Sequence, residues 1–88
     1  KDVTTVSLYP NPSINTTWIK VTGSEGLDAK VNVYAKDGKL VRTDLLLEEV
    51  SAGNYALRLD VSTLHQGVYS VTIKTAQNSW TEKLIVIR

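Results

Sequence analysis

Apolar and polar residues alternate in seven short segments of this 88-residue chain, and this period of two constrains its fold more than any other feature. Successive side chains of a β-strand point to opposite faces, so such a segment buries one face and exposes the other. The helix-like patch at residues 45–50 is too short to persist alone. We expect strands at residues 6–9, 17–22, 30–35, 40–46, 55–61, 69–73 and 80–88. This pattern predicts one all-β domain over residues 1–88, a seven-stranded immunoglobulin-like antiparallel β-sandwich.

Turn-forming residues separate the predicted strands. Pro10 and Pro12 cannot donate hydrogen bonds within a central sheet ladder, so residues 9–12 indicate an edge or a fixed turn. Asp37 and Gly38 lie between two alternating runs, which predicts a β-hairpin with a type I′ turn. Further loops are expected at residues 23–26, 51–54 and 62–66, and a turn at residues 76–79.

The segment from Leu64 to Tyr69 has the pattern of a tyrosine corner. We expect Leu64 to plug one end of the core and Gly67 to permit a tight approach of the backbone. Tyr69 then enters the next strand. We interpret these residues as structural, because such a corner locks a loop to the sandwich.

Few residues offer catalytic or metal-binding chemistry. The chain has no Cys, and His65 is its only His, so a typical zinc site cannot be assembled. His65 is also the only candidate base for a catalytic triad, and it lies in a turn that we interpret as structural. On a strand, adjacent Glu48 and Glu49 would point in different directions. Among the other candidate carboxylates, Asp37 and Asp60 are expected to form hydrogen bonds with nearby backbone. Asp28, Asp44 and Glu82 do not have the spacing of a calcium-binding loop. We predict a non-catalytic domain without cofactor or metal.

Composition narrows the classes of partner. The net charge is +1 and no basic run is present, so nucleic acid is not expected. No apolar stretch is long enough to cross a membrane. Trp18 and Trp80 allow two interpretations, a sugar-stacking platform or rings that cap the ends of a small core, and we favour the second.

Four blocks of sequence, in this order, resemble the type A C-terminal sorting domain of the type IX secretion system of Bacteroidetes. The first block consists of Tyr9, Pro10, Asn11, Pro12 and Ser13. The others are VYAKDGKLV at residues 33–41, LDVSTL and GVYSV within residues 59–71, and KLIVIR at residues 83–88. The chain departs from the family pattern at Ala35, where the family often has Asp.

The resemblance implies that the domain is the C-terminal part of a larger secreted protein and directs that cargo across the outer membrane. It further implies transit through the periplasm, recognition by the outer-membrane translocon, and removal by a sortase-like cysteine peptidase. The cargo then reaches the cell surface or the medium. Cleavage would lie at or upstream of residues 1–6. The alternative interpretation is an extracellular adhesive or carbohydrate-binding β-sandwich, and a third is a structural spacer.

A folded sandwich presents a surface rather than a pocket, and we expect the translocon to recognise two parts of it. The first is the terminal strand: Lys83, Leu84, Ile85, Val86, Ile87 and Arg88. The second is the hairpin tip: Asp37, Gly38 and Lys39. We hypothesise that an exposed apolar last strand offers unpaired backbone groups for strand addition, which would also allow a strand-swapped dimer. The alternative is a final strand that only completes one sheet.

Overall fold

The computed structural model describes residues 5–23, 29–75 and 78–88, and within them the regular secondary structure is entirely β. The strands are β1 (Thr5–Tyr9), β2 (Thr16–Thr22), β3 (Lys30–Ala35), β4 (Leu40–Leu46), β5 (Glu48–Ser51), β6 (Asn54–Asp60), β7 (Gly67–Lys74) and β8 (Ser79–Val86). The predicted all-β class is confirmed. The expected loop at residues 23–26 and turn at residues 76–79 lie partly outside the described residues. Asp28 lies wholly outside them.

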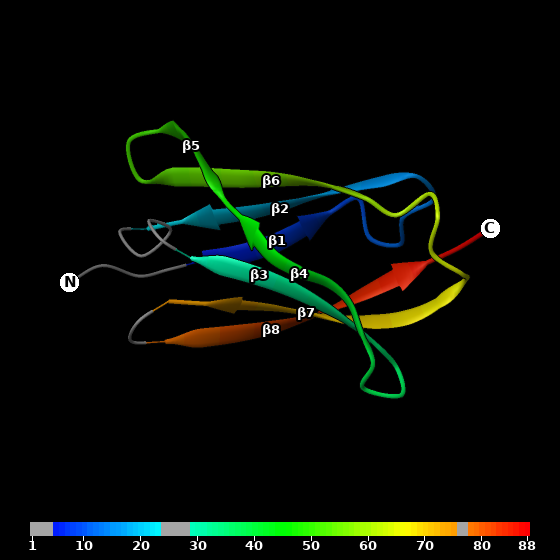
Figure 1. The fold of residues 1–88 in the computed structure, drawn as a ribbon. Coiled ribbons are helices and arrows are strands. Elements are labelled where there is room, and N and C mark those ends of the chain that lie inside the picture. The colour runs from blue at the N-terminus through cyan, green and yellow to red at the C-terminus, as the bar shows by residue number, and fades with distance from the viewer. Residues whose placement is uncertain (1–4, 24–28, 76–77) are drawn as a thin grey trace.

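The strands form two four-stranded antiparallel sheets that stack as a sandwich (Figure 1). One sheet has the order β1-β2-β6-β5 and the other β4-β3-β7-β8. If the strands are lettered in chain order, with β4 as C′, these sheets read A-B-E-D and C′-C-F-G. This is the immunoglobulin arrangement with one additional edge strand. The predicted sandwich architecture is therefore confirmed.

The described residues contain eight strands rather than the expected seven, and the additional one is β5. This strand overlaps the patch at residues 45–50 that looked helix-like in the sequence. After β4, Leu47 packs against the core, and the chain crosses to the other sheet (Figure 1). There Glu48 pairs with Ala56 of β6, although every side chain of β5 is exposed. Because backbone pairing rather than burial makes this strand, its side chains carry no alternation that reveals it.

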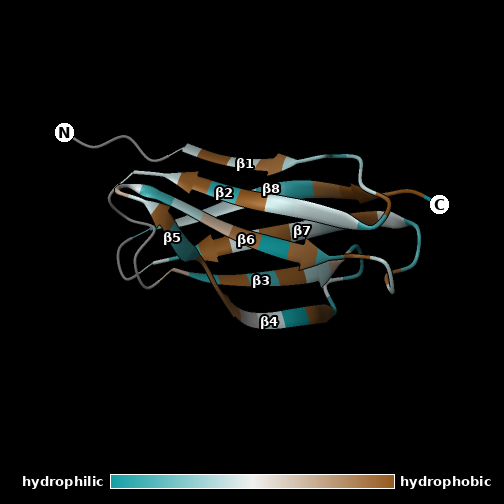
Figure 2. Cartoon of the chain, turned by 90° about the horizontal axis from the view of Figure 1, so that it is seen from above, coloured by the Kyte–Doolittle hydropathy of each residue, from teal (hydrophilic) through white to brown (hydrophobic). Residues whose placement is uncertain are grey.

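Alternating side chains of both sheets build one core. Along β2, Ile19 and Val21 are buried while Trp18 and Lys20 face solvent, as the sequence predicted. The alternation is visible along the strands in Figure 2. The fully buried apolar side chains larger than alanine in the two sheets and their connections are Ile19, Val21, Val31, Val33, Val61, Val71, Ile73, Leu84 and Val86. Each contributes about 1.5–3 kcal/mol by leaving water.

The predicted hairpin joins β3 to β4, but its turn is not type I′. Gly38 N donates to Ala35 O at 2.9 Å, and Ala35 N donates to Lys39 O at 2.7 Å. Lys36 and Asp37 are therefore the central residues of the turn, and Gly38 follows with φ of 89°. This pattern is a type I turn closed by a G1 bulge, which needs the left-handed conformation at the glycine. As expected, the Asp37 side chain belongs to the turn: its Oδ1 accepts from Lys39 N at 3.0 Å.

Candidate functional site

The terminal strand β8 lies at the edge of its sheet and pairs along its length with β7, from Lys74↔Ser79 to Gly67↔Val86. Its second half is embedded in the sandwich. Leu84 and Val86 are both fully buried, at 0% exposure, whereas Lys83 and Ile87 are exposed. Two of the six predicted recognition residues at this end are therefore core residues.

The free edge of this half-strand is covered by the segment that follows β1. Asn11 Nδ2 donates to Lys83 O at 2.7 Å, and Ile85 N donates to Asn11 Oδ1 at 2.9 Å. Ser13 continues the pairing: its N donates to Ile85 O at 2.8 Å and its O accepts from Ile87 N at 2.9 Å. Four outward backbone groups are thus satisfied, two by the Asn11 side chain and two by a short parallel bridge at Ser13. The expectation that this edge offers them unpaired is wrong, because a side-chain amide and one residue replace a neighbouring strand.

The covering segment is itself fixed. Thr17 Oγ1, which is buried, donates to Pro10 O at 2.9 Å. Ser13 is also buried, and its Oγ donates to Thr16 O at 2.7 Å. The segment with Pro10 and Pro12 is therefore a fixed connection beside an edge strand, one of the two placements expected for its prolines. The pairing roles of Asn11 and Ser13 were not predicted from the sequence, although an Asn between two prolines offers the donor that proline lacks.

Arg88 closes the end of the strand. Its guanidinium donates to the carbonyls of Ile14, Val61 (at 2.6 Å) and Leu64. Its backbone N donates to Gln66 Oε1 at 3.3 Å. A guanidinium carries five donors in a rigid fork, so it can serve carbonyls from two loops at once. Arg88 thereby joins the end of the chain to the loops after β1 and β6.

The tyrosine corner lies at the same end of the molecule. Tyr69 Oη donates to His65 O at 2.7 Å, and both Tyr69 and Leu64 are buried in the core cluster. The space around Gly67 differs from our expectation. A Cβ added there would meet its nearest atom, Tyr69 Cε1, at 4.0 Å, which is ordinary contact. The expected tight approach at Gly67 is therefore absent.

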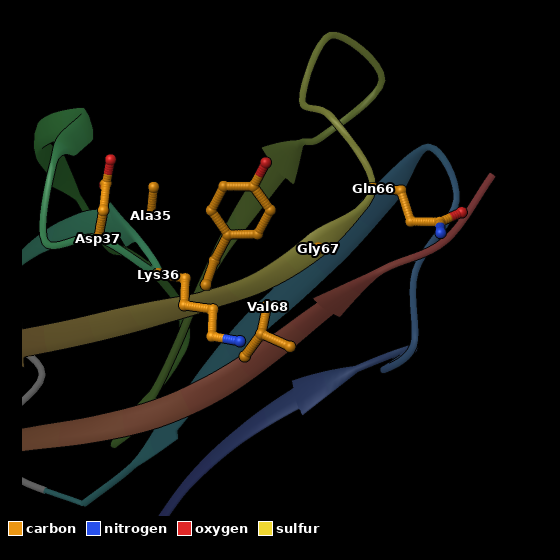
Figure 3. Close-up of a pocket in the computed structure, with 7 residues that line it drawn as sticks. Ala35, Lys36, Asp37, Gln66, Gly67 and Val68 are labelled. Carbon is orange, nitrogen blue, oxygen red and sulfur yellow. The ribbon is translucent and has the colours of Figure 1, made fainter.

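The hairpin tip borders a hollow beside this corner (Figure 3). The hollow has a volume of about 340 Å³ and is lined by hairpin and β7 residues: Ala35, Lys36, Asp37, Gln66, Gly67, Val68 and Tyr69. Ala35 is in register with Tyr69, and Gly67 with Val86. The start of β7 therefore lies between the hairpin tip and the end of β8, so both predicted recognition surfaces belong to one end of the sandwich.

A comparison with known protein families identifies the family of this domain. The family model described as "Secretion system C-terminal sorting domain" matches residues 7–87. The chain belongs to this family. A search of curated proteins found no match. The match covers the first three sequence blocks and residues 83–87 of the fourth, and the domain is a C-terminal sorting signal for type IX secretion, which implies export to the cell surface or the extracellular space.

Near this end of the sorting domain, the pKa of the Asp60 carboxyl is shifted from its ordinary value. Asp60 Oδ1 accepts from Ser62 Oγ at 2.6 Å and from Ser62 N at 2.9 Å. These bonds favour the ionised form and lower the pKa of the Asp60 carboxyl below its usual range. As predicted, Asp60 is engaged with nearby backbone. Within residues 5–23, 29–75 and 78–88, no cluster of three His, Cys, Asp or Glu side chains could hold a metal ion, and no helix is long and apolar enough to span a membrane.

Proposed function

We propose that the outer-membrane translocon recognises this sorting domain in its folded form, at the end of the sandwich formed by the hairpin tip and the second half of β8. Its cargo is N-terminal to it, passes through the periplasm, and reaches the cell surface or the medium when a sortase-like cysteine peptidase removes the domain. Residues 1–4 of the expected cleavage region lie outside the described residues.

The observation that carries the proposal is the sealed edge of β8. Because Asn11 and Ser13 occupy the outward backbone groups at Lys83, Ile85 and Ile87, a partner cannot add a strand there without opening the fold. Exposed side chains remain available for recognition at this end. They include Lys83, Ile87, Asp37 and Lys39.

The domain acts as a signal and not as an enzyme in this proposal. His65 is exposed, and its carbonyl serves the tyrosine corner. Asp37 and Asp60 are used by local turns. These placements leave the common triad and paired-carboxylate arrangements without their components on the described part of the chain.

The test is secretion of a fluorescent reporter that carries a signal peptide and this domain. It compares wild-type and translocon-deficient Bacteroidetes cells. Export should require both the domain and the translocon. Within the domain, Lys39→Ala and Lys83→Ala should reduce export, whereas the matched Lys74→Ala should not, because Lys74 is exposed at the opposite end of β7.

Each variant needs an unfolding curve, so that lost export can be separated from lost stability. Equal export of all three lysine variants would contradict recognition at this end of the sandwich. Export that persists in translocon-deficient cells would contradict the proposed partner.

A further inference from the structure

The outward face of the β1-β2-β6-β5 sheet, which Figure 2 views from its own side, carries adjoining hollows, two of which are lined by Trp18. The volumes of these two hollows are about 340 and 330 Å³, and they share Trp18, Val50 and Ala56. The first hollow extends to Tyr9 and Lys20, and the second to Glu48, Leu57 and Arg58. This face is separate from the recognition surface proposed above.

The register of the strands explains why the sheet is hollowed here. Ala56 of β6 lies between Lys20 of β2 and Glu48 of β5, so a small residue sits between two longer side chains. One step along the sheet, Trp18 pairs with Tyr9 of β1. Ala56 thus forms a floor, at 8% exposure, between an aromatic pair on one side and Val50 on the other.

Three aromatic and aliphatic residues that line these hollows do not serve the core. Tyr9, Trp18 and Val50 are exposed by 67%, 39% and 66%, and none belongs to the core cluster. By contrast, Trp80 packs against the core, as the interpretation of both rings as core caps predicted, whereas that interpretation is wrong for Trp18. Burial therefore accounts for Trp80 and leaves the exposed pair of Tyr9 and Trp18 unexplained.

The chemistry of the face selects one class of ligand. Aromatic faces stack on the C–H surfaces of a sugar ring, and the rim offers donors from Lys20 and Arg58 and an acceptor from Glu48. Hydroxyl groups both donate and accept, so a rim of mixed charge suits a polyhydroxyl ligand. Each hollow is near the lower limit, roughly 300 Å³, of small-molecule sites.

A protein partner fits this face less well. β2 and β6 are paired on both sides, so their backbones cannot accept an added strand. A stable protein interface needs roughly 1,000 Å² of buried surface, whereas the exposed apolar side chains lining the two hollows are Tyr9, Trp18 and Val50.

We propose that this face binds a saccharide of at least two sugar units, one in each hollow, with Trp18 between them. The inference does not depend on the sorting role. It identifies a second function for the domain, binding of a saccharide, which does not require the domain to stay joined to its cargo.

The test is an NMR titration of this 88-residue chain, with the indole N–H signal of Trp18 as the reporter. The probes are cellohexaose, laminarihexaose, mannohexaose and chitohexaose, with polygalacturonate as an acidic probe. At least one neutral probe should shift the Trp18 signal with a dissociation constant below about 10 mM. Trp18→Ala should weaken binding about five- to tenfold, because it removes the stacked ring.

A second variant keeps both rings. Ala56→Leu would fill the floor of both hollows and should abolish binding with the fold preserved, as judged by the amide spectrum. Lys20→Ala should weaken binding severalfold, whereas the matched Lys74→Ala on the other sheet should not. Failure of all five probes at about 10 mM, or equal binding by Ala56→Leu, would overturn the proposal. Binding of polygalacturonate alone would indicate electrostatic attraction to Lys20 and Arg58 rather than recognition of a neutral saccharide. That result would also overturn the proposal.

Discussion

β8 is one strand with two unlike halves. In the first half, residues 79–82, the side chains are exposed or half-buried, and on the described part of the chain no hydrogen bond to the backbone is found beyond the ladder with β7. In the second half, Leu84 and Val86 are fully buried, Asn11 and Ser13 cover the edge, and Arg88 holds the end. The comparison shows that the segment most apolar in sequence is held most firmly, whereas the more polar half is the open edge.

The largest difference between the halves should appear when one side chain of each is shortened. Leu84→Ala removes a fully buried side chain and should lower the free energy of unfolding by about 2–5 kcal/mol. Thr81→Ala, on the exposed edge, should change it by less than about 0.5 kcal/mol. Urea unfolding followed by circular dichroism measures both. Similar losses of unfolding free energy for the two variants would mean that the two halves of β8 contribute equally to stability.

The next effect should come from opening the sealed edge. Asn11→Ala removes two hydrogen bonds to β8 and should cost about 1–2 kcal/mol. The amide of Ile85 should then exchange with solvent faster than in the parent, while the amides paired with β7 change only with global stability. Asn15→Ala is the matched control, since the Asn15 side chain is exposed. An unchanged exchange rate at Ile85 would show that Asn11 does not seal the edge.

A smaller loss is expected at the end of the strand. Arg88→Lys keeps the charge but cannot reach carbonyls of two loops with a fork of donors, so it should cost about 0.5–1.5 kcal/mol. Arg42→Lys provides a comparison, because Arg42 binds Val41 O and Thr63 Oγ1 near the other edge of the same sheet. Equal stability of parent and Arg88→Lys protein would indicate that any cation suffices at this position.

The smallest effect should be a pH dependence from Asp60, beside the loop that Arg88 holds. The Ser62 bonds lower its pKa in the folded protein, so they stabilise the fold at pH values above the ordinary aspartate pKa of about 3.9. This contribution should disappear as the pH falls through the lowered pKa. Asp60→Asn should therefore be less stable than the parent at pH 7, with the difference shrinking in acid. A pH-independent difference would assign the effect to the neutral hydrogen bonds.

Much of the fold could be predicted from local alternation, and the rest depends on distant pairing. The buried positions of β2, β3 and β7 follow from the period of two, because one face of each strand lies on the core. β5 escaped prediction since Glu48–Ser51 has no buried face. The turn at Gly38 was predicted in place but not in type, because an Asp-Gly pair suits more than one hairpin geometry.

The sealed edge could not be predicted for a different reason. Asn11 meets Lys83 and Ile85 across 72 and 74 positions of sequence, and no local pattern reports such a contact. The terminal segment, residues 83–88, therefore resembled an exposed edge in the sequence, although two of its six side chains are buried and four of its outward backbone groups are paired. The exposed residues of the proposed recognition surface, such as Lys39 and Lys83, stay predictions.

The pairing of Asn11 and Ser13 with the end of β8 also has a temporal consequence. A ribosome makes the chain from its N-terminus, so the partner of Asn11 does not exist until residue 85 has been added. Everything upstream has by then been synthesised. A surface that forms only when this closure is complete would distinguish chains that contain residue 85 from chains terminated before it, and the fold itself would carry out that inspection before export.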